Sequence, residues 1–95
     1  MTTEEFRKHP AYKYYMETLL YNNLYSDLLS SFDYEYISYK YISYKYDNDE
    51  YMLIINNPDI INGIEKQLDR YLSMDIYKDL YYIKNDNIFY FYIKE

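Results

Sequence analysis

The chain contains no cysteine and no tryptophan, one glycine and two prolines among its 95 residues. Without cysteine, disulfide bonds, thiol catalysis and thiolate metal sites are excluded. The single glycine, Gly63, excludes a glycine-rich phosphate-binding loop. The single histidine, His9, leaves no histidine pair for a metal-dependent hydrolase. These absences favour a protein that is not an enzyme and that holds neither a metal nor a cofactor.

Long apolar runs and a basic leader segment are also missing. Crossing a bilayer takes about 20 consecutive apolar residues, and the longest uninterrupted apolar run here is only a few residues. No basic stretch followed by an apolar one opens the chain, so the sequence predicts no secretory signal. We therefore expect a protein with no membrane partner in the cytoplasm, or in the host cytoplasm if it is viral.

Tyrosine is what the chain has in excess, with 18 copies in a protein of formal net charge −6. Isoleucine, lysine and asparagine are also abundant, and all four residue types have AT-rich codons. A biased genome is therefore one explanation of the tyrosines. The same bias would favour lysine, however, so it does not explain the net acidity.

The combination of tyrosine and acidic charge is typical of a binding protein. Tyrosine offers a large contact area with few rotatable bonds and is enriched in protein interfaces. Net negative charge disfavours a nucleic-acid backbone as the partner and favours a basic protein surface. Because each buried hydroxyl needs a hydrogen bond, we expect some tyrosines on the surface. The length and the 49% apolar content indicate one folded domain over residues 1–95.

Hydrophobic periodicity and turn residues predict six elements in the order αββαββ. The predicted helices cover 11–31 and 57–73, and the predicted strands cover 33–46, 51–55, 75–84 and 88–94. Such an order fits an α+β fold with a four-stranded, mainly antiparallel sheet and two helices packed on one face. The opposite face would be rich in tyrosine and uncovered, which makes it the expected place for a partner or a second copy.

The first predicted helix has two apolar sides. One stripe faces a core, while the second is tyrosine and predicts burial against a partner or another chain. The first stripe is Met16, Leu20, Leu24 and Leu28, and the second is Tyr14, Tyr21 and Tyr25.

A tandem pentapeptide, Tyr-Ile-Ser-Tyr-Lys, fills residues 36–40 and again 41–45. Because strand residues alternate between two faces, a repeat of odd length places Ile37 and Ile42 on opposite sides. A bulge between the copies or partial cover of both faces would accommodate this. Replication slippage is the alternative origin of the repeat.

The sequence Asp47-Asn48-Asp49-Glu50 predicts a hairpin turn with an acidic tip. It lacks the spacing and the central glycine of a calcium-binding loop. We therefore expect the three carboxylates to contact a basic partner, with neighbouring tyrosines supplying adhesive area. The predicted partner-binding residues are Tyr39, Tyr41, Tyr44, Tyr46, Asp47, Asp49 and Glu50.

These features lead to the hypothesis of a small acidic inhibitor from a phage, virus or mobile element. It would occupy a basic nucleic-acid-binding surface of a host protein, with carboxylates in place of phosphates. Anti-CRISPR and other DNA-mimic proteins act in this style, although no motif here belongs to one family. A homodimeric assembly protein is the first alternative. Single-stranded nucleic-acid binding by a tyrosine-rich sheet is the second, and the absence of a basic block disfavours it.

Overall fold

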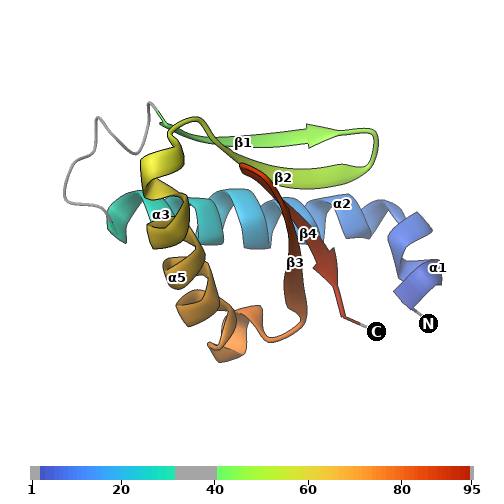
Figure 1. Ribbon diagram of the computed structural model, residues 1–95. Coiled ribbons are helices and arrows are strands. Elements are labelled where there is room, and N and C mark those ends of the chain that lie inside the picture. Colours follow the sequence, from blue (N-terminus) through green and yellow to red (C-terminus); the bar gives the residue numbers. More distant parts are fainter. Residues whose placement is uncertain (1–2, 32–40, 95) are drawn as a thin grey trace.

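The structure, a computed structural model, describes residues 3–31 and 41–94 (Figure 1). A helical region comes first, followed by a hairpin, a second helix and a second hairpin. The elements are α1 (Thr3–Lys8), α2 (Pro10–Glu17), η1 (Thr18–Tyr25), α3 (Ser26–Ser31), β1 (Ile42–Asp47), β2 (Glu50–Ile55), η2 (Pro58–Ile60), α5 (Ile61–Leu72), η3 (Asp75–Tyr77), β3 (Leu80–Asn85) and β4 (Ile88–Ile93).

The four strands form one sheet in the order β1-β2-β4-β3, and all three pairings are antiparallel. The sheet is strongly twisted in Figure 1, so that the β1–β2 hairpin runs across the direction of β3 and β4. This arrangement confirms the predicted α+β fold with a four-stranded antiparallel sheet.

A two-residue turn joins β1 to β2. Asp47 pairs with Glu50 in the register, which leaves Asn48 and Asp49 as the turn residues. Their φ angles are 51° and 62°, in the left-handed region that a type I′ hairpin turn requires at both positions. Asparagine and aspartate tolerate this region better than most residues. The turn predicted from composition is therefore confirmed.

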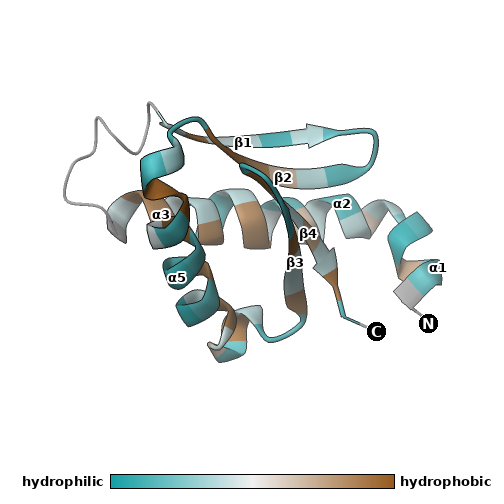
Figure 2. Ribbon diagram, viewed as in Figure 1, coloured by the Kyte–Doolittle hydropathy of each residue, from teal (hydrophilic) through white to brown (hydrophobic). Residues whose placement is uncertain are grey.

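The core lies between the inner face of the sheet and the helices. Alternate residues of the two central strands point inward, and each of these is at most 8% exposed. The same core contains the first stripe of the long helical region and two residues of α5, so both helices cover one face. Brown, apolar residues concentrate on the central strands and the neighbouring helix in Figure 2. The inward residues are Tyr51, Leu53 and Ile55 of β2 and Phe89, Phe91 and Ile93 of β4, and the helices contribute Met16, Leu20, Leu24, Leu28, Ile64 and Leu68.

The middle of the first long helix, η1, has π-helical geometry. In an α-helix with 3.6 residues per turn, residues spaced four apart are rotated by about 40° from one to the next around the helix axis. A stripe of such residues would therefore turn away from the core side of an α-helix. A four-residue step falls short of one full π turn, so the π segment rotates the stripe in the opposite direction and offsets that drift away from the core side. Leu20, Leu24 and Leu28 consequently stay between 0% and 2% exposed.

The second helix begins as predicted, with Asn57 before Pro58. The Asn57 side chain accepts a hydrogen bond from the Asp59 N–H at 3.0 Å, and Pro58 takes the first helical position. The chain then forms η2 and α5, whose apolar side packs against the sheet.

The strand predicted at 75–84 differs from the structure at its beginning. The strand predicted for 75–84 begins at Leu80, because Asp75–Tyr77 forms a 3-10 turn instead. There Tyr77 is 1% exposed and its hydroxyl donates to Asp27 Oδ2 at 2.7 Å, a tertiary contact that the local sequence does not reveal. For the strand predicted at 33–46, β1 begins at Ile42, and the first copy of the tandem repeat lies outside the described residues.

Candidate functional site

The face of the sheet that points away from the helices is uncovered in the described part of the chain. Its side chains alternate with the core residues along each strand. Ile83 is 53% exposed and Tyr81 is 37% exposed. We name this surface the open face. It consists of Ser43, Lys45, Asp47, Glu50, Met52, Ile54, Tyr81, Ile83, Asn85, Ile88, Tyr90 and Tyr92.

The centre of the open face is apolar. The strand register places Met52 beside Tyr90, and Tyr90 beside Ile83. The next row pairs Ile54 with Ile88. These side chains form a continuous patch, which is the kind of surface that marks an interaction site.

Tyrosine and carboxylate meet at the end of the open face near the hairpin turn. Tyr81 and Tyr92 lie with ring centroids 5.5 Å apart and planes at 33°. The Tyr92 hydroxyl donates a long hydrogen bond of 3.4 Å to Glu50 Oε2. Burial, followed by the nearby Glu50 carboxylate, raises the pKa of Tyr92. The acidic tip is therefore joined to the aromatic part of the face.

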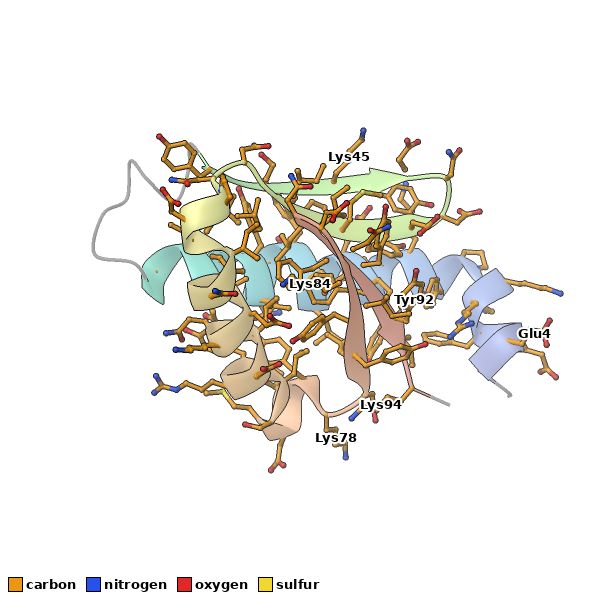
Figure 3. The ribbon with its side chains drawn as sticks, viewed as in Figure 1. Glu4, Lys45, Lys78, Lys84, Tyr92 and Lys94 are labelled. Atoms are coloured by element: carbon orange, nitrogen blue, oxygen red, sulfur yellow. The ribbon has the colours of Figure 1, made fainter. Side chains whose placement is uncertain are left out.

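The charged side chains of the open face are exposed. Asp47 and Glu50 have no ion-pair partner within 3–31 and 41–94. Lys45 is the cation on the same face, and it extends away from the helices in Figure 3. Two carboxylates without an ion pair, those of Asp47 and Glu50, thus border the apolar centre of the face. The ammonium group of Lys45 lies at its β1 edge.

The three acidic residues that the sequence assigned together lie on two sides of the sheet. Asp47 and Glu50 belong to the open face, whereas Asp49 contacts the helix side through the Tyr46 hydroxyl, which donates to Asp49 Oδ1 at 2.8 Å. This hydrogen bond raises the pKa of Tyr46. Asp49 is separated from Asp47 and Glu50 because it is a turn residue. Its side chain therefore does not follow the alternation of side chains along the strands.

Two of the four predicted adhesive tyrosines, Tyr44 and Tyr46, are not on the open face. Tyr39 lies outside the described residues, and Tyr41 is half-buried before β1. Tyr44 and Tyr46 point to the helix side with Ile42 and pack against the core. Because side chains alternate along a strand, a buried Ile42 predicts that Tyr44 and Tyr46 lie on the same, helix-facing side of the sheet. The tyrosines of the open face are instead Tyr81, Tyr90 and Tyr92, which sequence analysis did not assign to the site.

Tyr44 is the centre of an aromatic cluster between η1 and β1. Its ring centroid lies 5.1 Å from that of Tyr21 and 6.2 Å from that of Tyr25, whose hydroxyl donates to the Ile42 carbonyl at 2.9 Å. The Tyr44 hydroxyl is buried without a hydrogen-bond partner among the described residues, and burial raises its pKa to about 12. Part of the second stripe of the helix is thus covered by β1, although Tyr21 stays 52% exposed and Tyr14 stays 76% exposed.

A second surface lies on the helix side, where α1 and α2 meet the hairpin turn. It is a groove of about 600 Å³, which we name the basic groove. Three of its side chains are cationic and one is a carboxylate, in a chain whose net charge is −6. Its lining residues are Arg7, Lys8, His9, Tyr12, Lys13, Tyr46, Asp49, Tyr51 and Tyr92. The sequence shows the cations at 7, 8 and 13, but the fold is needed to place tyrosines beside them.

No group of three or more metal-ligating side chains occurs within residues 3–31 and 41–94. Over the same residues, none of the helices has both the length and the apolar character needed to cross a bilayer.

Comparison with known proteins gave no match. No known protein family, no curated protein and no solved structure is significantly similar to this chain. The open face and the basic groove therefore have to be interpreted from their chemistry alone.

Proposed function

We propose that this protein is a non-catalytic inhibitor that binds a partner protein through its open face. The partner surface would be basic, of the kind that contacts nucleic acid, and it would contain an apolar patch. The observation that carries the proposal is the uncovered apolar face bordered by Asp47 and Glu50, two exposed carboxylates without an ion pair among the described residues.

The two parts of the face would contribute differently to binding. The apolar centre, with Met52, Ile83 and Tyr90, supplies area that is removed from water. Asp47 and Glu50 stand in for phosphate groups at lysine and arginine side chains of the partner. The net charge of −6 adds long-range attraction toward a basic protein and repulsion from nucleic acid.

Competition with nucleic acid tests this proposal. The protein is used to capture partners from a lysate, and each captured protein is then purified and loaded with a fluorescently labelled oligonucleotide. We expect this protein to displace the oligonucleotide. In an Asp47→Lys/Glu50→Lys variant, two lysines repel the basic partner where two carboxylates attracted it. The variant should therefore displace the oligonucleotide at least about tenfold less effectively.

The control is an Asp59→Lys/Asp75→Lys variant, which makes the same change in net charge at exposed positions outside the sheet. It should displace the oligonucleotide nearly as well as the unmodified protein. An equal loss of oligonucleotide displacement in both double variants would mean that only net charge matters. If oligonucleotides do not compete with this protein for the captured partner, the proposed surface is contradicted.

A second copy of the chain is the other occupant that the open face could accept. Sedimentation velocity distinguishes the two cases. A stable dimer that persists in the Asp47→Lys/Glu50→Lys variant and displaces no oligonucleotide would replace the inhibitor proposal by an assembly role.

A further inference from the structure

The basic groove contains a tyrosine hydroxyl that has no hydrogen-bond partner among the described residues. Tyr51 is 2% exposed and lines the groove, yet its hydroxyl makes no hydrogen bond to any residue that the structure describes. Burial raises the pKa of Tyr51, so the phenol keeps its proton and remains a donor. It is therefore available to an acceptor atom in the groove.

Two cations of the groove are positioned by contacts with neighbouring groups. Arg7 Nη2 donates to the Ile93 carbonyl at 3.2 Å, which fixes the guanidinium at the end of β4. Lys13 Nζ lies 5.0 Å from the ring centroid of Tyr46. Among the described residues, Lys13 forms an exposed ion pair of 3.9 Å with Glu17, a geometry that contributes little to stability.

Further donors come from the polar rim of the groove. His9 Nδ1 accepts a hydrogen bond from the Ala11 N–H at 3.0 Å, so the hydrogen of its neutral imidazole is on Nε2. Burial raises the pKa of Tyr12; the Arg7 charge lowers it, and the Asp49 charge raises it. The groove thus combines three positive charges with neutral donors, while Asp49 in its lining and the neighbouring Glu17 and Glu50 oppose an anion.

We propose that the basic groove binds a small ligand with two or more phosphate groups. Several positive charges and several O–H and N–H donors match the many acceptor oxygens of such an anion. The volume of about 600 Å³ lies in the range of small-molecule sites, which extends from about 300 to 1,000 Å³. The two smaller clefts beside Tyr21, of 280 and 290 Å³, contain no lysine or arginine. Tyr92 belongs to both the basic groove and the open face, but the cations on which this proposal depends, Arg7, Lys8 and Lys13, belong to the groove.

Isothermal titration calorimetry at low ionic strength tests the site with pyrophosphate, ATP and AMP as probes. We expect one equivalent of pyrophosphate or ATP to bind with a Kd below about 1 mM, and AMP to bind more weakly because it has one phosphate. Similar affinities for ATP and pyrophosphate would identify phosphate recognition alone, and tighter binding of ATP would identify a nucleotide. No heat of binding from any of the three probes would overturn the proposal.

Two matched double variants separate the groove from general electrostatics. Lys8→Gln/Lys13→Gln removes two charges from the groove, while Lys66→Gln/Arg70→Gln removes two from the exposed side of α5. The first should weaken binding by about tenfold or more, and the second by less than about twofold. Equal weakening would contradict a defined site.

The single hydroxyl provides the last test. Tyr51→Phe keeps the ring and removes only the unpartnered donor, so it should leave the unfolding midpoint unchanged or higher while weakening pyrophosphate binding about three- to tenfold. Unchanged binding in Tyr51→Phe would remove the hydroxyl from the site. Hexaglutamate as a control anion should bind more weakly than ATP, and equal or tighter binding of hexaglutamate would assign the groove to acidic peptides and overturn the phosphate proposal.

Discussion

Alkaline pH should unfold this protein cooperatively, because several of its tyrosines are buried. Burial raises the pKa of Tyr44 to about 12 and raises those of Tyr51, Tyr77 and Tyr82 further. For Tyr77 and Tyr82, hydrogen bonds donated to carboxylates add to the effect of burial. In the unfolded chain all four phenols ionise near pH 10.

The sign and size of the effect follow from proton linkage. Each of these groups holds its proton in the folded state at a pH where the unfolded state has lost it. Their stabilising contribution is therefore complete below about pH 10 and is lost as the pH rises toward the folded-state pKa. One such group lowers the free energy of unfolding by about 1.4 kcal/mol per pH unit, so four groups remove about 5 kcal/mol by pH 11. A domain of this size has about 5 to 15 kcal/mol in total, so we expect unfolding between about pH 11 and 12.

The assay follows tyrosinate absorbance and far-ultraviolet circular dichroism in the same titration. We expect a group of tyrosines to ionise together with the loss of circular dichroism. Tyr51→Phe removes one of the four groups and should raise the midpoint by about 0.3 to 0.5 pH unit, whereas Tyr14→Phe, at a side chain 76% exposed, should leave it unchanged. If all tyrosines ionise near pH 10 while the circular dichroism persists, the burial argument is refuted.

Three further predictions concern the stability of the fold, measured by urea denaturation. Tyr77→Phe loses the hydrogen bond to Asp27 and should lower the free energy of unfolding by about 1 to 3 kcal/mol, and a double-mutant cycle with Asp27→Asn that gives no coupling would contradict this contact. Leu24→Ala, at a position 1% exposed beneath the sheet, should lower it by about 2 to 5 kcal/mol; a change below that range would mean that the π-helical segment does not face the core. Asn48→Val places a β-branched residue at φ 51° and should lower it by about 1 to 2 kcal/mol, while Asn48→Gly should be neutral or stabilising, and equal stability of the two variants would exclude the type I′ turn.

The fold class could be predicted because hydrophobic periodicity, turn residues and caps all agreed with the final arrangement. The Asn57-Pro58 helix start and the Asp47–Glu50 turn are examples in which local chemistry determines local structure. The turn at Tyr77 is a counterexample. There, burial of the ring and a hydrogen bond to Asp27, 50 positions away, override a strand-like sequence.

The proposed binding surface was predictable only in part. The uncovered, tyrosine-containing face followed from placing both helices on one side of the sheet. The assignment of Tyr44 and Tyr46 to the contact ignored strand alternation, which puts them with the buried Ile42. The basic groove had no sequence signal of its own, because it forms only when α2 lies against the tip of the β1–β2 hairpin and brings Tyr46 beside Lys13.

A pair of isoleucine variants tests most directly whether the open face is the binding surface. Ile83 lies on that face and is 53% exposed, and Ile76 lies in η3, outside the sheet, and is 57% exposed. Ile83→Glu should leave the unfolding midpoint unchanged and weaken binding to the captured partner by about a hundredfold, while Ile76→Glu should bind like the unmodified protein. If Ile83→Glu binds the partner as tightly as Ile76→Glu does, the open face is not where this protein makes its contact.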